Sequence, residues 1–195
     1  MSEVYFTADT HFGHTNILYL CNRPWNTIEE HDEELVDNWN SIVRPKDRIY
    51  HVGDFSFRAD KEHATRIFRK LNGSKFLVQG NHDTNFTKSL GWGGEVEKGL
   101  TVTVDNQKFS LNHYPERVWN HMYQGAIHLY GHVHGRLPGI GLSMDVGVDA
   151  NDFKPIHSSD VVKLVSRNTP YFPELPVIKR EHGTPYDLIT RKLSP

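Results

Sequence analysis

Short apolar runs alternate with amphipathic stretches over the first 80 residues. The runs at 4–8, 49–52 and 76–78 are rich in Val, Ile, Leu and aromatic residues, which is typical of buried strands. Between them, apolar residues recur every three or four positions over 28–43 and 60–71, as they do on one face of a helix. This alternation of strands and helices predicts an α/β fold.

Local signals mark the ends of the two longer helices. Thr27 and Glu30 have the spacing of a capping box, and the helix that they begin should stop before Pro45. Asp60 should cap the second helix, and Gly73 should follow its end in a left-handed conformation.

The pattern changes after residue 100, where strand-like runs follow one another closely. The runs at 100–104 and 108–111 flank Asp105-Asn106-Gln107, which predicts a hairpin. Further strands are expected at 126–130 and 143–148. The second half should therefore be rich in strands, with antiparallel or mixed pairing.

Length and composition are those of one ordinary folded domain. The chain has 195 residues, of which 37% are hydrophobic and 24% charged. Its formal net charge is −2, so a nucleic-acid partner would have to meet a local basic patch. We expect the domain to span 1–167, and a tail rich in Pro and charge, 168–195, to pack on it or extend it.

Cysteine usage and the N-terminus point to the cytoplasm. Cys21 is the only cysteine, so no intrachain disulfide can form, as is usual for a reducing compartment. The start, Met-Ser-Glu-Val-Tyr-Phe, lacks the basic and apolar regions of a signal peptide. We also expect no membrane partner, because no apolar stretch approaches the length of a span.

Histidine is abundant, with 13 residues, and it gathers with Asp and Gly where the predicted strands end. Five clusters stand in this order: Asp9-x-His11, Gly53-Asp54, Gly80-Asn81-His82-Asp83, His113 and Gly131-His132-x-His134. In α/β sheets, sites form beyond the carboxyl ends of the strands. Two pairs are separated by one residue, Asp9 with His11 and His132 with His134. If each segment is extended, both side chains of a pair point to the same side of it. Oxygen and imidazole ligands together suit Mn, Fe, Zn, Ni or Co better than Ca or Mg alone.

With these clusters in this order, residues 4–155 resemble the calcineurin-like metallophosphoesterases. Two stretches, Thr-Ala-Asp-Thr-His-Phe-Gly-His and Val-Gly-Val-Asp-Ala-Asn-Asp-Phe-Lys-Pro, are similar to those of small single-domain members from bacteria and phages. The resemblance implies that 1–167 is a metallophosphoesterase domain. Its fold would be a four-layer αββα sandwich, in which two mixed β-sheets lie between helices.

The resemblance also implies a site with two divalent metal ions, manganese being the first expectation. The first ion would be bound by Asp9, His11 and His134, the second by Asn81, His113 and His132, and Asp54 would bridge both. His82 would not be a ligand; it would approach the leaving group as a general acid.

This donor set suits the hydrolysis of phosphate esters. Two metals about 4 Å apart can hold a bridging hydroxide near neutral pH and clamp the ester for in-line attack. The neutral Asn and His ligands leave the site positive, which favours an anionic substrate. We expect phosphodiesters of the nucleotide or nucleic-acid type. Alternatives are a phosphomonoesterase or protein phosphatase with the same dinuclear site, or a non-catalytic binding scaffold such as a retromer subunit of similar fold.

Five further residues have two interpretations each. His14 would contact the substrate or support a ligand by a hydrogen bond. Arg23 and Arg58 would bind the substrate phosphate, or be loop-packing or surface residues. Tyr114 and Trp119 would stack on a base or simply pack.

Other polar residues are expected to have structural roles. Asp83 should orient a neighbouring loop or His82. The remaining histidines that we can assign divide into surface residues, His31, His63 and His157, and core residues, His51 and His128.

Overall fold

The three apolar runs of the first half form neighbouring parallel strands. In the computed structural model, which describes residues 2–169, β1 (Val4–Thr7) pairs with β2 (Arg48–His51), and β2 pairs with β3 (Ser74–Leu77). Parallel neighbours require crossover connections, and helices provide them here. The expected alternation of strands and helices is therefore present.

The helices of this half begin where the capping residues predict. After α1 (Thr15–Leu20) comes α2 (Ile28–Ile42), and α3 (Lys61–Lys70) lies between β2 and β3. The side chains of Thr27 and Asp60 accept backbone N–H hydrogen bonds at the starts of α2 and α3.

The second half supplies a mixed sheet of four strands. A hairpin of β4 (Gly99–Val104) and β5 (Gln107–Asn112) is followed by β6 (Ile127–Tyr130) and β7 (Ser143–Asp145), in the order β4-β5-β6-β7. The hairpin turn consists of Asp105-Asn106 alone, both with positive φ, as a two-residue turn requires. The strand order and pairing make this sheet mixed, with β5, β6 and β7 parallel.

Two elements near residue 160 were not expected from the sequence. The last predicted strand, 143–148, is shorter in the structure, ending at Asp145, and Gly147 forms an isolated bridge with Ala8, which follows β1. The chain then passes through a short helix to β8 (Ile156–His157), which pairs antiparallel with β1, and α5 (Ser158–Val165). The first sheet therefore has the order β3-β2-β1-β8 and is also mixed.

The three remaining helices of residues 2–169 are short. They are α4 (Asn85–Lys88) and two 3-10 helices, η1 (Met122–Gln124) and η2 (Val148–Ala150).

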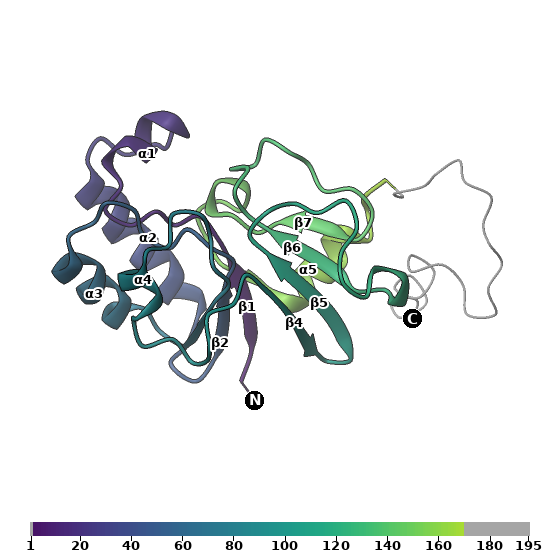
Figure 1. Ribbon diagram of the computed structural model, residues 1–195. Coiled ribbons are helices and arrows are strands. Elements are labelled where there is room, and N and C mark those ends of the chain that lie inside the picture. Colours follow the sequence, from purple (N-terminus) through teal and green to yellow (C-terminus); the bar gives the residue numbers. More distant parts are fainter. Residues whose placement is uncertain (1, 170–195) are drawn as a thin grey trace.

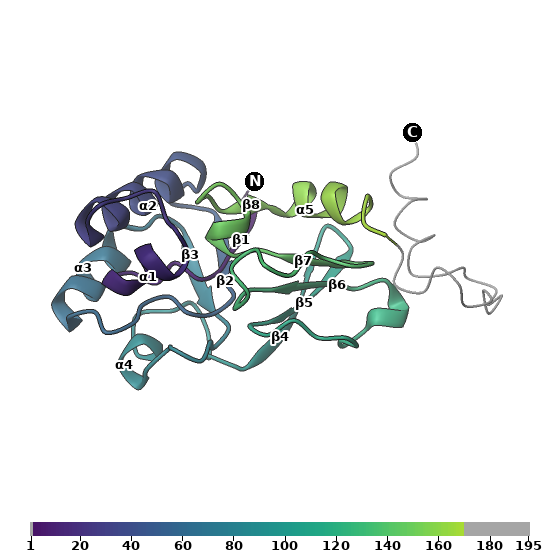
Figure 2. The same cartoon turned by 90° about the horizontal axis from the view of Figure 1, so that it is seen from above.

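Alternation along the first sheet divides the core into two layers. Val4 and Phe6 of β1 face the second sheet, where they pack with residues such as Phe109. Tyr5 faces the helices and packs in the layer that includes Trp39 of α2. Figures 1 and 2 show helices α1–α4 on one side of the molecule and strands β4–β7 on the other. The α/β fold with two mixed sheets and helices is thus confirmed.

Two predictions concern the membrane and the tail. Within residues 2–169, no helix combines the length and the apolar character needed to cross a bilayer. The predicted tail, 168–195, lies outside the described residues except for 168–169, where Asn168 donates hydrogen bonds to the carbonyl groups of Gly141 and Ser143.

Candidate metal centre

The candidate ligands follow the carboxyl ends of five strands, at the junction of the two sheets. Asp9 and His11 follow β1, Asp54 follows β2, Asn81 follows β3, His113 follows β5, and His132 and His134 follow β6. A contact of 2.9 Å between His113 Nδ1 and the Val52 carbonyl oxygen links the sheets at this point.

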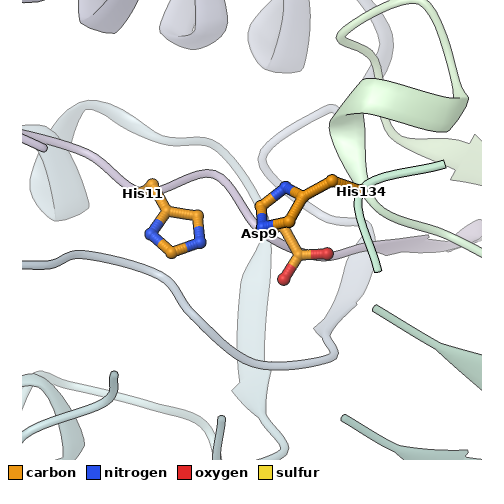
Figure 3. Close-up of side chains that lie close together, drawn as sticks. All are labelled: Asp9, His11 and His134. Atoms are coloured by element: carbon orange, nitrogen blue, oxygen red, sulfur yellow. The ribbon is translucent and has the colours of Figure 1, made fainter. Parts of the chain in front are cut away.

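A first cluster consists of Asp9 and His11, which follow β1, and His134, which follows β6 of the other sheet. One ligand atom from each residue lies within 4.8 Å of the others, and Figure 3 shows the three side chains facing a common space. Asp9 Oδ1 and both ring nitrogens of His11 are buried without a hydrogen-bond partner. Buried polar atoms of this kind are costly, and a divalent cation would satisfy Asp9 Oδ1 and one nitrogen of His11. The donor set therefore fits a metal ion.

A second cluster consists of Asp54, His113 and His132, again within 4.8 Å. Asn81 joins it, because its Oδ1 lies 3.0 Å from His113 Nε2 and 3.0 Å from His132 Nδ1. Asp54 Oδ2 lies 3.3 Å from His113 Nε2 and 3.6 Å from Nε2 of His11 in the first cluster. One carboxylate oxygen is thus within reach of both clusters.

The backbone at the ligands is unusual. Five of the seven candidates have positive φ angles: Asp9, His11, Asp54, His132 and His134, at 57°, 50°, 60°, 70° and 50°. The expectation that Asp9 with His11 and His132 with His134 lie on extended segments is therefore wrong. The convergence comes from left-handed residues, which for side chains other than Gly cost about 1–3 kcal/mol each and concentrate at functional sites.

Burial and hydrogen bonds together set the protonation of the two clusters. Burial raises the pKa of Asp9 to about 7, so its carboxylate is poorly stabilised unless a cation lies beside it. It lowers the pKa of His11 well below its usual range, which keeps the imidazole neutral. Burial also acts to raise the pKa of Asp54, but the hydrogen bond with His113, the charges of His113 and His11 and the His82 N–H together outweigh it, and the value falls to about 2. Burial acts to lower the pKa of His134 and His113, but hydrogen bonds with Asp149 and Asp54 act the other way, and the pKa of His134 rises to about 10. Neutral imidazoles and ionised carboxylates are the forms that bind metals, so these two imidazoles would release a proton when they bind an ion.

His82 and His14 lie beside the first cluster together with Phe57. The His82 ring is half-buried, with its centroid 4.1 Å from that of Phe57 and 5.4 Å from that of His11. Its backbone N–H donates to Asp54 Oδ1 at 2.8 Å, which fixes the loop. His14 is buried, with its ring 4.8 Å from that of Phe57.

The two arginines occupy different environments. Arg58 is exposed, and its guanidinium lies 5.1 Å from the ring centroid of Phe57. We call the residues that surround the two clusters, Phe57 and Arg58 among them, the rim. Arg23 is only 5% exposed and binds both carboxylate oxygens of Asp149. These contacts favour the loop-packing interpretation of Arg23 over direct contact with a substrate.

Asp149 and its surroundings were missed from the sequence. The residue lies in the stretch Val-Gly-Val-Asp that carried the resemblance, and its Oδ2 lies 2.7 Å from Nδ1 of the candidate ligand His134. Cys21 also lies within 4.8 Å of these two groups. An Asp directly after an apolar run, the same pattern as in the other clusters, was the signal that could have found it.

Asp83 connects two ligand loops. Its carboxylate accepts hydrogen bonds from the backbone N–H groups of Gly80, Asp54 and Phe55, at 2.8, 2.9 and 2.9 Å. The expectation that Asp83 orients a neighbouring loop is confirmed. Burial acts to raise its pKa.

Tyr114 and Trp119 differ in exposure. Tyr114 is 48% exposed, and its ring lies 4.5 Å from that of His132, at the rim of the second cluster. Trp119 is 5% exposed and stacks on His128. Of its two interpretations, base stacking or packing, the structure therefore favours packing.

The exposure of the other histidines differs in part from the expectation. His31 was expected at the surface but is fully buried, because it bonds Asp32 and Arg23. His63 is half-buried, since it also bonds Asp32, and His157 is half-buried too. The expected core residues, His51 and His128, are both 0% exposed.

The chain is similar to several known proteins. A family model described as the calcineurin-like phosphoesterase superfamily domain matches residues 3–140. The uncharacterized protein MJ1445 of Methanocaldococcus jannaschii is 33% identical over 175 residues, covering 86% of this chain and 93% of the relative. The gene 66 protein of Mycobacterium phage D29 is 28% identical over 188 residues, covering 80% and 93%.

A solved structure is also similar. The crystal structure of AQ665, a protein of unknown function from Aquifex aeolicus, has a TM-score of 0.68 and 26% sequence identity. The similarity covers 84% of this chain and 100% of that one.

Proposed function

The chain belongs to the calcineurin-like phosphoesterase superfamily, and on that premise we propose that it hydrolyses phosphodiesters of the nucleotide or nucleic-acid type. The observation that carries the proposal is the shared carboxylate, since Asp54 Oδ2 lies 3.6 Å from His11 Nε2 and 3.3 Å from His113 Nε2. An oxygen common to two clusters is what a dinuclear centre requires.

The ligand assignment follows from these clusters. Asp9, His11 and His134 would hold the first ion, and Asn81, His113 and His132 the second, with Asp54 between them. Metal ions bound there supply Lewis-acid chemistry, lowering the pKa of coordinated water from about 16 to about 7 and offsetting charge on phosphoryl oxygens. Manganese suits the mixed oxygen and imidazole donors.

His82 is the residue that we assign to the leaving group. Its loop is fixed by the hydrogen bond from its N–H to Asp54 Oδ1, and Phe57 supports its ring from one side. Because it is half-buried beside His11, its imidazole can reach an ester bound across the two clusters. There it would donate a proton to the departing oxygen.

The rim favours a diester over a monoester. Phe57 and Arg58 lie near the first cluster, because Phe57 contacts His82, which lies beside His11, and Arg58 lies over Phe57. Tyr114 adjoins the second cluster through His132. Each flank thus offers an aromatic ring, and one adds a cation, for a group attached to the phosphate. A diester carries two such groups, one for each flank, and a monoester carries only one.

A paired substrate assay tests the proposal. The protein loaded with manganese is assayed on bis(4-nitrophenyl) phosphate, 4-nitrophenyl phosphate, a dinucleoside monophosphate and a nucleoside monophosphate. We expect a higher kcat/KM for each diester than for its matched monoester. Preference for monoesters would instead support a phosphomonoesterase with the same centre, and absence of turnover in protein containing two ions would support a scaffold.

Two rim variants test recognition. Arg58→Ala and Tyr114→Ala should raise KM for the dinucleotide more than they lower kcat, as expected for binding shared by ground and transition states. Tyr123→Ala is a matched control, because Tyr123 is 68% exposed on η1, at the opposite end of β6 from the ligands. Unchanged kinetics in both rim variants would contradict the assignment.

A further inference from the structure

The guanidinium of Arg23 is buried beside the first cluster, and all five of its N–H donors have partners. Nε and Nη2 bind Asp149 Oδ1 and Oδ2 at 2.9 and 2.8 Å. Nη2 also donates to the Asp9 carbonyl oxygen at 2.7 Å, and Nη1 to that of Thr10 at 3.0 Å. The last contact, 2.7 Å from Nη1 to Nε2 of His31, completes the set.

Asp149 transmits this arrangement to a candidate ligand. Its Oδ2 accepts a hydrogen bond of 2.7 Å from His134 Nδ1, in addition to the one from Arg23. A carboxylate in this place fixes both the orientation and the tautomer of the ring, with hydrogen on Nδ1. Nε2 of His134 is then the atom left for the first cluster.

Arg23 also holds the loop that carries the other two ligands. Asp9 and His11 have φ angles of 57° and 50°, and the carbonyl groups of Asp9 and Thr10 lie between their α-carbons. A left-handed backbone persists only where its surroundings hold it. Two hydrogen bonds from Arg23 to these carbonyl groups provide such support, so one side chain joins both halves of the first cluster.

A second layer fixes Arg23 itself. His31 Nδ1 lies 2.8 Å from Asp32 Oδ1, so it donates there and its Nε2 is free to accept from Arg23. Asp32 Oδ2 in turn lies 2.6 Å from His63 Nε2 on α3, and the carboxylate also accepts from the Gly13 N–H. The network therefore connects α2 and α3 with the metal centre.

The second cluster has a different kind of support. Its ligand His113 is oriented through Nδ1 by the uncharged Val52 carbonyl group, at 2.9 Å. The two loops that carry Asp54 and Asn81 are held by backbone N–H groups of Asp54 and Gly80, which donate to Asp83. An ionic pair thus supports the first cluster alone, and changes to that pair should act selectively.

We propose that Arg23 and Asp149 are positioning residues of the first metal site, holding His134 and the Asp9 loop in the geometry that binds the ion. The inference rests on the proposed metal centre and goes beyond it, because neither side chain is a ligand. It also gives a role to the Val-Gly-Val-Asp stretch, which the ligand set leaves unexplained.

The test is direct measurement of manganese binding to the full chain. Wild-type protein should bind two ions by chelator competition and give the electron paramagnetic resonance spectrum of an exchange-coupled pair. Asp149→Asn removes the charge and Arg23→Lys removes the fork of donors, and each should weaken one ion about 10- to 100-fold, as loss of outer support typically does. At limiting manganese the coupled spectrum should give way to that of a single ion.

Asp47→Asn is the matched control. Asp47 is a buried carboxylate near the start of β2, at the opposite end of the strand, where it accepts hydrogen bonds from the N–H groups of Glu3 and Arg44. Its loss should lower the melting temperature and leave both manganese affinities unchanged. If one variant of the Arg23–Asp149 pair fails to fold, the other carries the test.

The outcomes separate the two proposals. A wild-type chain that binds no pair of ions would overturn the metal centre and this inference with it. A wild-type chain that binds two ions, with variants that bind both equally well or lose both equally, would overturn only the positioning role. Selective loss of one ion supports it.

Discussion

Gly80 lies where two loops that carry candidate ligands touch, and replacing it with Ala is a strong test of the proposed metal centre. A Cβ at this position would lie 2.2 Å from Asp54 Oδ1 and 2.4 Å from the Asp54 backbone nitrogen. Gly80 does not need a positive φ, so the effect of the substitution is steric and not conformational. Asp54 is the carboxylate within reach of both clusters, and it would have to move.

The size of the effect follows from these distances. Ordinary contact begins near 3.4 Å, so the Asp54 oxygen must retreat by about 1.2 Å and its backbone nitrogen by about 1 Å. That movement strains the hydrogen bonds from Asp54 N to Asp83 and from His82 N to Asp54 Oδ1. Overpacking of this kind costs about 1–3 kcal/mol of stability. A misplacement of about 1 Å at a reacting centre costs on the order of 100-fold in rate.

The assay combines urea unfolding, metal content by elemental analysis and turnover of a diester. Gly80→Ala should unfold at lower urea concentration, bind fewer than two ions per chain and lose about two orders of magnitude in kcat. Gly91→Ala is the matched control, since its Cβ would meet only Phe68, at 3.8 Å, and it should behave as wild type. A Gly80→Ala variant with two ions and normal turnover would refute the close approach on which the reasoning depends.

Three other changes have defined outcomes. Asp54→Asn should weaken both ions, because a neutral amide bridges two cations poorly; two ions per chain with normal turnover would contradict it. His82→Ala should keep its metal and lose about 100- to 10,000-fold on alkyl esters but much less on nitrophenyl esters, which need no acid; equal losses would reject the acid role. Burial lowers the pKa of His128 from 6.5 to about 4, and its Nε2 accepts the Glu116 N–H. As the pH falls, His128 is protonated in the unfolded chain before it is protonated in the folded chain. The contribution of neutral His128 to the free energy of unfolding is therefore complete above pH 6.5 and is lost as the pH falls toward 4, at about 1.4 kcal/mol per pH unit. Between pH 7 and 5, the free energy of unfolding measured in urea should therefore fall by about 2 kcal/mol more in wild type than in His128→Gln. Equal losses in the two proteins would contradict this role of His128.

The elements that could be predicted are those whose signals are local. The capping side chains of Thr27 and Asp60 lie within three residues of the N–H groups that they bind. The same holds for the Asp105-Asn106 turn, where φ is positive at both residues. Such contacts form between close neighbours in the sequence, so the sequence alone contains them.

Elements that depend on distant partners could not be predicted. β8 has two residues, too few for a periodic pattern, and it exists because Ile156 and His157 pair with Phe6 and Tyr5 of β1. Burial of Arg23 likewise depends on Asp149, 126 positions away in the sequence. Exposure of His31 was misjudged for the same reason, since its partner Arg23 is drawn inward by that pair.

The candidate ligands combine both situations, and they show why a motif can be found without its geometry. Asp9-x-His11 is visible in the sequence, yet its side chains converge because both residues adopt a left-handed backbone, which no local preference of Asp or His dictates. That conformation costs energy, and Arg23 offsets part of it through two carbonyl groups of the Asp9 loop. Asp83 likewise supports the loop of Asp54, whose φ is also positive, through three N–H groups. It follows that the geometry of this centre is fixed as much by these supporting carboxylate and guanidinium groups as by the ligands. Transferring the ligand motifs to another strand end without their supports should therefore not reproduce the site.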